Sequence, residues 1–137
     1  MNRRILIVDD DAMVRSTMRL LLQKHYDIDE AADGLEALDK LKSESYSLVF
    51  LDMVLPGMRG EAVIDKLSPD FTRHTPIVIC TGGDLGHKAA ASPSQPGLYY
   101  ACKPALIGRI LEVTADILES VRPDQALEDT MQGALRA

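Results

Sequence analysis

The chain has 137 residues and a formal net charge of −6, with 46% hydrophobic and 26% charged residues. This length suits one domain with a full hydrophobic core, and the acidic balance argues against the basic footprint of a nucleic-acid-binding protein. No apolar run approaches the roughly 18 residues of a membrane span, and the run after the first arginines is too short for a signal peptide, so we expect a cytoplasmic protein that binds neither nucleic acid nor membrane.

The first half of the chain alternates continuous apolar runs with helix-like stretches. The runs at 5–8 and 48–52 are typical of strands buried on both faces. Between them, apolar residues recur three or four positions apart, the spacing of amphipathic helices. We expect a strand at 5–8 and then a helix that ends near His25, with Val14, Met18, Leu21 and Leu22 facing inward. An edge strand at 26–31 should follow. After it we expect a helix capped by Asp33 and Glu36, with Leu35, Leu38 and Leu41 facing inward, and a strand at 48–52.

The second half continues this alternation but contains more helix-breaking residues. Pro56-Gly57 predicts a turn soon after Asp52. Pro93 and Pro96 interrupt a stretch that begins with helix-compatible residues at 88–91, so we expect only a short, broken fourth helix there. The other expected elements are a helix at 60–67, a strand at 76–81, a strand at 98–102 and a last helix from about Leu106.

Continuously apolar strands that alternate with helices indicate a parallel sheet covered on both faces. We therefore expect an α/β domain at residues 1–121, with a five-stranded parallel sheet in the order 2-1-3-4-5 and helices on both faces. This is the flavodoxin-like, doubly wound arrangement. Residues 122–137 form a C-terminal extension, for which a short amphipathic helix and the start of a linker are both open interpretations.

Five polar side chains lie at the ends of these predicted strands. Asp9 and Asp10 follow the first strand, Asp52 ends the third, Thr81 ends the fourth and Lys103 follows the fifth. In the expected strand order these ends meet in one crevice. Three carboxylates there repel each other unless a hard divalent cation such as Mg²⁺ neutralises them. Because an aspartate can attack a phosphoryl group, the pattern predicts a phosphoryl-accepting site.

Several motifs resemble the receiver domain of two-component response regulators. They are Ile-Leu-Ile-Val-Asp-Asp-Asp at 5–11, Leu-Asp-Met-Val-Leu-Pro-Gly-Met at 51–58, the strand-end Thr81, and the Lys103-Pro104 pair. They occur in the family's order, with 42 residues from Asp10 to Asp52, 29 more to Thr81 and 22 more to Lys103. The resemblance covers residues 4 to about 121.

The resemblance implies a site for phosphorelay signalling. Asp52 would accept a phosphoryl group from a phosphohistidine on a sensor histidine kinase or a histidine phosphotransfer protein, in a reaction that depends on Mg²⁺. The protein would be a phosphoacceptor signalling domain and not an enzyme, with at most weak autophosphatase activity. The implied protein ligands of Mg²⁺ are Asp9, Asp10, Asp52 and the backbone carbonyl of Val54.

The resemblance also implies how the signal leaves the site. Lys103 would bind the phosphoryl group, Thr81 would move toward it, and Tyr100 would be the aromatic switch residue that turns inward behind Thr81. The face formed by helix 4, strand 5 and helix 5 would then change. That face would contact a downstream protein target or a second copy of the chain in a homodimer.

Some positions depart from the family's pattern. Ala105 follows Lys103-Pro104, where family members often carry an aromatic residue. Val54 and Gly83 stand two residues after Asp52 and Thr81, at positions that often influence hydrolysis in this family. Neither residue has a polar side chain that could orient a water molecule. We therefore predict a long-lived phosphoaspartate.

Two other interpretations remain open. Asp9-x-Asp11-x-Met13 partly resembles the Asp-x-Asp-x-Thr motif of haloacid-dehalogenase-type phosphatases, in which Asp9 would be the nucleophile and Asp11 the acid. Met13 departs from that motif, and Asp52 would then have no role. The other interpretation is a receiver-like interaction module that is not phosphorylated.

Overall fold

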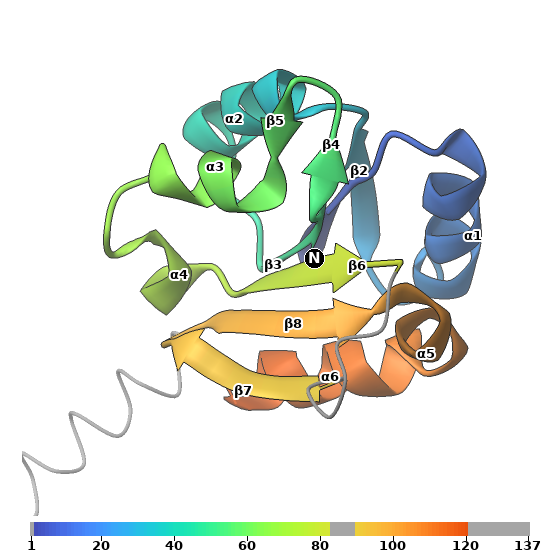
Figure 1. Ribbon diagram of the computed structural model, residues 1–137. Helices are drawn as coiled ribbons and strands as arrows, with labels where there is room; N and C mark the ends of the chain where they lie inside the picture. The colour runs from blue at the N-terminus through green and yellow to red at the C-terminus, as the bar shows by residue number, and fades with distance from the viewer. Residues whose placement is uncertain (1, 83–89, 121–137) are drawn as a thin grey trace, which may run out of the picture.

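The computed structural model describes residues 2–82 and 90–120 of the chain. Its centre is a six-stranded sheet with helices on both faces (Figure 1). The strands lie in the order β2-β1-β3-β6-β8-β7, and the first five of these are parallel, which confirms the predicted order of the five-stranded parallel sheet. The strands are β1 (Arg4–Val8), β2 (Asp27–Ala31), β3 (Leu48–Asp52), β6 (Ile77–Thr81), β7 (Ala90–Gln95) and β8 (Leu98–Cys102).

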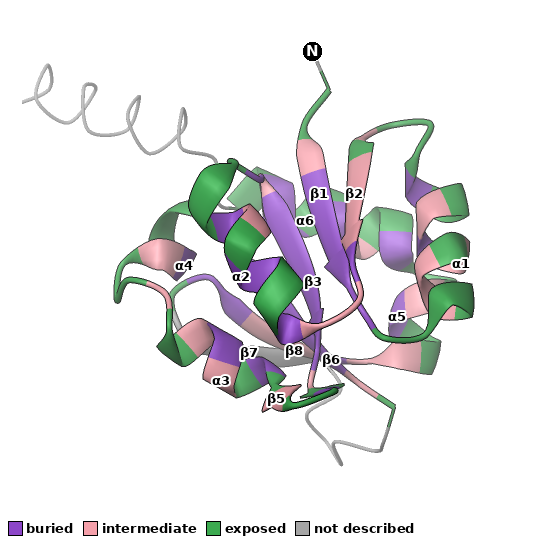
Figure 2. Cartoon of the chain, turned by 90° about the horizontal axis from the view of Figure 1, so that it is seen from above, coloured by how far each residue is buried: buried purple, intermediate pink, exposed green. Residues whose placement is uncertain are grey.

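The helices cover the sheet in two layers (Figure 1). One face carries α1 (Ala12–Leu22), α5 (Lys103–Gly108) and α6 (Ile110–Ser120), and the other carries α2 (Gly34–Ser43), α3 (Gly60–Asp65) and the short α4 (Phe71–His74). Successive side chains of a strand point to opposite faces. Leu6 and Val8 therefore pack under α2 and α3, whereas Ile5 and Ile7 pack under α1 and α6. Figure 2 shows the resulting buried centre, with exposed residues on the outer sides of the helices.

The sixth strand, β7, was not predicted. Ala90 and Ala91 begin a strand antiparallel to β8, so the prediction of a fourth helix is wrong at these two residues. Pro93 explains why this stretch forms a strand and not a helix. Proline breaks the interior of a helix, but it is tolerated on an edge strand, where its missing N–H group costs no hydrogen bond of the sheet. The described residues thus place β7 beside β8 in the region of the expected helix 4–strand 5–helix 5 face, and the other residues of the expected fourth helix, at 88–89, lie outside the described residues.

Two predicted helices also differ in which leucines they bury. In α1, Leu21 is 38% exposed, although the sequence predicts that it faces inward. Leu35 is 68% exposed, whereas Leu38 and Leu41 are buried as expected. Asp33 does cap α2, since its carboxylate accepts a hydrogen bond from the Glu36 amide at 2.8 Å. Gly34 takes the inner position of the first turn, where an added Cβ would lie only 3.0 Å from the Met58 sulfur, and this turns Leu35 outward.

The predicted last helix is two helices. α5 begins at Lys103, and α6 begins after Arg109, whose backbone angles (φ −132°, ψ 25°) interrupt the helical path. Within the described part of the chain, no helix has the length and apolar character to cross a membrane. The predicted extension at 122–137 lies outside the described residues, as does Gly83.

Candidate functional site

Three aspartates meet at the carboxyl edge of the central strands. One carboxylate oxygen from each of Asp9, Asp10 and Asp52 lies within 4.8 Å of the others. Asp9 follows β1 and Asp52 ends the neighbouring β3, so the parallel pairing of these strands brings their ends together. Asp9 and Asp52 are buried, with 3% and 6% of their surface exposed, whereas Asp10 is exposed. Oxygen ligands of this kind, open to solvent on one side, fit a hard divalent cation.

Lys103 reaches both buried carboxylates from the end of β8, which is two strands from β3 and three strands from β1. Its ammonium nitrogen lies 2.8 Å from Oδ2 of Asp9 and 3.2 Å from Oδ2 of Asp52. β8 positions this side chain, because Lys103 directly follows the strand and begins α5. The side chain then crosses the end of β6, which lies between β8 and β3. The sequence prediction that Lys103 and the aspartates share one crevice is therefore consistent with the described geometry.

The charges of the cluster influence one another. Burial raises the pKa of Asp52, the negative charge of Asp9 raises it further, and Lys103 opposes the rise only in part. Burial alone would lower the pKa of Lys103, but hydrogen bonding and charge from Asp9, and then from Asp52, outweigh it and raise the pKa. Burial also raises the pKa of the Cys80 thiol to about 12, so this neighbour of Asp52 on β6 stays neutral. The lysine thus offsets part of the carboxylate repulsion, and a bound cation would offset more.

A tight backbone loop holds Asp52. The predicted Pro56-Gly57 turn is present, with Gly57 at φ +71°, and it joins the short strands β4 (Val54–Leu55) and β5 (Met58–Arg59). The loop closes where the Gly60 amide donates to the Met53 carbonyl at 2.8 Å. A Cβ atom at Gly60 would lie 2.5 Å from the backbone oxygen of Asp52, so only glycine permits this approach. Val54 is 61% exposed at the mouth of the site.

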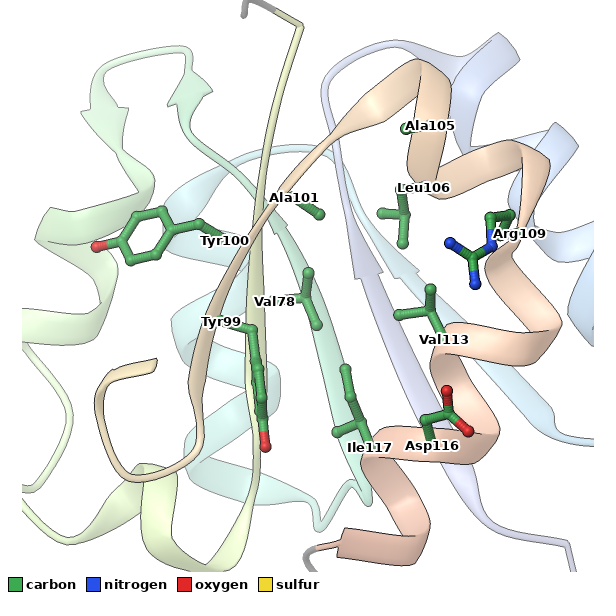
Figure 3. A pocket seen from close by; sticks show the side chains of 10 residues that line it. All are labelled: Val78, Tyr99, Tyr100, Ala101, Ala105, Leu106, Arg109, Val113, Asp116 and Ile117. Atoms are coloured by element: carbon green, nitrogen blue, oxygen red, sulfur yellow. The ribbon is translucent and has the colours of Figure 1, made fainter. Parts of the chain in front are cut away.

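Thr81 and Tyr100 lie on the same face of two neighbouring strands. Thr81 of β6 is in register with Cys102 of β8, which is two residues after Tyr100. Figure 3 shows the Tyr100 ring on the opposite side of β8 from α6. Tyr99 instead faces α6, where it helps to line a groove of about 360 Å³ with Val113 and Ile117. Tyr100 therefore lies on the face of the sheet that carries Thr81.

Two residues near Asp9 have roles that the sequence did not predict. Asp11 is the N-cap of α1, because its carboxylate accepts a hydrogen bond from the Met13 amide at 2.9 Å. Arg15 donates to the backbone carbonyl of Asp9 at 2.7 Å and pairs with Glu30 of β2 at 3.0 Å. The sequence shows only that Arg15 and Arg19, four residues apart, share one helix face; the structure adds that Glu30 pairs with both.

The domain that carries this site is similar to proteins of a known family. Residues 5–114 match the family model of the response regulator receiver domain. The chain belongs to this family. Aspartate phosphorylation and Mg²⁺ binding are typical of receiver domains, which act as phosphoacceptors in two-component signalling.

Individual relatives agree with this membership. The response regulator MprA of Mycobacterium bovis is 31% identical over 129 residues, which are 93% of this chain and 56% of MprA. A CheY-like receiver domain protein from Methanospirillum hungatei, solved as a crystal structure, is 26% identical in sequence. Its TM-score is 0.71 over 90% of this chain and 99% of that one. The response regulator TrrA from Thermotoga maritima, solved in complex with Mg²⁺ and BeF, is 29% identical, with a TM-score of 0.69 over 84% of this chain and 98% of that one.

The relatives also differ from this chain in extent. The chain spans 36% of the length of one matching curated relative and 56% of the length of another. The receiver domain is thus the part that they share with it.

Proposed function

We propose that this receiver domain takes part in a phosphorelay by accepting a phosphoryl group on Asp52. The donor is a phosphohistidine of a sensor histidine kinase or of a histidine phosphotransfer protein. The observation that carries the proposal is the buried Asp52 carboxylate, whose Oδ2 lies 3.2 Å from the Lys103 ammonium beside two further aspartates. These groups fit an aspartate nucleophile better than a helix cap or a surface ion pair.

The transfer is a displacement at phosphorus. An oxygen of the Asp52 carboxylate forms a bond to phosphorus while the bond from phosphorus to the histidine nitrogen breaks, and the imidazole leaves with the bonding electron pair. Lys103 binds an oxygen of the transferred group and offsets the charge that develops on it. Its present contacts with Asp9 and Asp52 put the ammonium within reach of that oxygen.

The acidic residues around Asp52 would hold Mg²⁺. The proposed ligands are Asp9, Asp10, Asp52 and the backbone carbonyl of Val54, an all-oxygen set that suits this ion. When bound, Mg²⁺ would neutralise carboxylate charge and stabilise the phosphoryl oxygens. The complex of TrrA with Mg²⁺ and BeF supports this assignment.

The response would pass from Asp52 to the surface through β6 and β8. Thr81 would move toward the phosphoryl group, and Tyr100 on the same sheet face would follow it as the switch residue. Phosphorylation would in this way favour one of two packing arrangements. Because β7 pairs with β8 beside α6, we expect the altered surface to include β7, β8 and α6. That surface would bind a downstream protein or a second copy of the chain.

Phosphoryl uptake from a small acyl phosphate tests the proposal. The protein is incubated with acetyl phosphate and Mg²⁺, and the phosphorylated fraction is separated on a phosphate-affinity gel. We expect uptake by the wild type, loss of uptake in Asp52→Asn, and loss after chelation of Mg²⁺. The matched control is Asp11→Asn, because asparagine still caps α1 but cannot serve as the acid of a phosphatase.

The same experiment separates the three interpretations. The phosphatase interpretation requires that Asp52→Asn still takes up the phosphoryl group and that Asp11→Asn does not. The interaction-module interpretation requires that the wild type takes up no phosphoryl group. Either result would contradict the proposed function.

A further inference from the structure

The guanidinium group of Arg15 joins the acidic site to the edge strand of the sheet. Its Nη1 atom donates to the backbone carbonyl of Asp9 at 2.7 Å, and its Nε atom lies 3.0 Å from Oε1 of Glu30 on β2. The other oxygen of Glu30 lies 2.6 Å from Nε of Arg19. The Arg15 side chain is only 18% exposed, so these contacts are partly shielded from water.

The contact with Arg15 fixes the backbone between Asp9 and Asp10. The carbonyl of Asp9 and the amide of Asp10 belong to one planar peptide unit. The amide of Asp9 is already anchored, because it donates to the Ala31 carbonyl at 3.1 Å. With the carbonyl held by Arg15, both backbone polar groups of Asp9 are fixed. The direction in which the chain continues to the exposed Asp10 is then fixed as well.

The side chain of Asp9 is constrained too. Its Oδ1 atom accepts a hydrogen bond from the Asp11 amide at 2.9 Å, and its Oδ2 atom pairs with Lys103 at 2.8 Å. Asp10 is exposed, and none of the side-chain hydrogen bonds found in the described residues involves its carboxylate. The orientation of Asp10 therefore depends on its backbone, and hence on the peptide that Arg15 holds.

Glu30 reduces the electrostatic repulsion between Arg15 and a metal ion at the site. A cation close to a metal site weakens metal binding through repulsion. The carboxylate of Glu30 pairs directly with Arg15 and offsets this charge. Because Glu30 also pairs with Arg19, it offsets the charge of Arg15 in part. The contribution of Arg15 to the site is then mainly geometric, through the Asp9 carbonyl.

We propose that Arg15, held by Glu30, is a positioning residue that orients the Asp9–Asp10 peptide for divalent-cation binding. This inference rests on the proposed function of the site. Arg15 does not touch the reacting atoms, and it acts through the Asp9 carbonyl. Outer-shell contacts of this kind commonly change metal affinity by about 10–100-fold when they are removed.

The chain offers a matched control for this proposal. Arg15→Met removes both the contact with Asp9 and the pair with Glu30. Arg19→Met removes a pair with the same Glu30 but leaves the contact with Asp9 in place. Both substitutions remove one positive charge from α1 and one ion pair with Glu30, so a difference in Mg²⁺ affinity between them reports on the contact with the Asp9 carbonyl.

Binding of Mg²⁺ alone to the unphosphorylated full chain is the direct test, measured by isothermal titration calorimetry. We expect Arg15→Met to raise the Kd for Mg²⁺ on the order of tenfold and Arg19→Met to leave it close to the wild-type value. Thermal unfolding without Mg²⁺ checks that both variants fold, and Arg15→Met should lose more stability because it removes two contacts whereas Arg19→Met removes one. If Arg15→Met fails to fold, Arg15→Lys and Arg19→Lys are compared in the same way, because lysine cannot hold Asp9 and Glu30 together in the forked geometry of arginine.

Equal Mg²⁺ affinity in the folded Arg15 and Arg19 variants would overturn the inference. A wild type that binds Mg²⁺ and takes up phosphoryl groups would leave the proposed function standing in that case. A wild type that does neither would contradict the proposed function itself.

Discussion

Asp52 differs from the other two aspartates in its surroundings. It is buried at the end of a buried strand, it faces Lys103, and its pKa is raised by burial and by the charge of Asp9. Asp9 is buried as well, but the contacts of its two carboxylate oxygens with the Asp11 amide and Lys103 are short, at 2.9 and 2.8 Å. The oxygens of Asp52 have longer contacts, at 3.4 Å from the Val54 amide and 3.2 Å from Lys103. Asp10 is exposed. These differences suit Asp52 to bond formation and the other two residues to holding a cation.

The residue at position 54 should set the lifetime of the phosphorylated state. Val54 is 61% exposed at the mouth of the site and offers no polar group to orient an attacking water molecule. We expect slow decay of the phosphoaspartate in the wild type and in Val54→Ala, and severalfold faster decay in Val54→Asn. Decay is followed on a phosphate-affinity gel after removal of the phosphodonor. Rapid decay in the wild type, with no change in Val54→Asn, would contradict this prediction.

The buried hydroxyl of Thr114 has a consequence for stability. Its side chain is fully buried on α6, and its hydroxyl oxygen has no hydrogen-bond partner among the described residues. A buried unpaired hydroxyl is costly, so Thr114→Val should stabilise the protein by about 1 kcal/mol. Denaturant unfolding measures the change. The matched control is Thr17→Val, where the hydroxyl donates to the Met13 carbonyl at 2.9 Å and its removal should not stabilise; equal effects in both variants would refute the explanation.

At the scale of elements, a polar network joins β1, β2 and α2 at the edge of the sheet far from Asp52. Asp29 on β2 accepts hydrogen bonds from the Tyr46 hydroxyl at 2.6 Å and from Lys40 at 2.9 Å. Arg4 on β1 lies over the Tyr46 ring, 5.1 Å from its centroid. Burial alone would raise the pKa of Asp29, but the Tyr46 and Lys40 contacts outweigh it and lower the pKa. The contacts of Asp29 therefore stabilise the fold most while its carboxylate is ionised.

This lowered pKa predicts how stability depends on pH. A carboxyl group with a lower pKa in the folded state contributes stability above its unfolded pKa, and the contribution is lost as the pH falls through the folded pKa. The usual pKa of Asp29 is 3.8. We expect the melting temperature to fall below this pH, and to fall less steeply in Asp29→Asn. Asp39→Asn, at an exposed position of α2, should show the same change of melting temperature with pH as the wild type. The same pH dependence in all three proteins would contradict the role of Asp29.

At the scale of the whole molecule, the sheet order and the candidate site were predictable for one reason. The central strands are continuous apolar runs, and the polar residues that end them must meet at one edge of a parallel sheet. Strand β7 was not predictable in this way, because its sequence Ala-Ala-Ser-Pro-Ser-Gln has neither a helical nor a strand pattern. Its conformation depends on pairing with β8, which is a tertiary contact.

The contacts of long polar side chains could not be predicted from the sequence either. Arg15 has several acceptors within reach along the chain, and only the packing of α1 against β1 and β2 selects the Asp9 carbonyl and Glu30. The break at Arg109 between α5 and α6 likewise has no strong sequence signal apart from Gly108. Periodicity predicts which faces are buried, but it does not predict which polar atoms meet.

Ligand binding should also be visible in the stability of the whole domain. An ion that binds only the folded state stabilises it, by about 2.7 kcal/mol at a concentration of 100 times Kd. We expect Mg²⁺ to raise the melting temperature of the wild type and of Asp39→Asn, and to have a much smaller effect on Asp10→Asn. Differential scanning calorimetry with and without Mg²⁺ measures this. An equal rise in Asp10→Asn would exclude Asp10 as a ligand.

The central claim is that Asp52 is the residue that becomes phosphorylated, and chemical mapping of the modified residue tests it most directly. Borohydride reduces an aspartyl phosphate to homoserine, which peptide mass spectrometry locates in the chain. After phosphorylation with acetyl phosphate and Mg²⁺, followed by reduction, we predict homoserine at position 52 and aspartate at positions 9, 10 and 11. Homoserine at position 9, or at any position other than 52, would contradict the account.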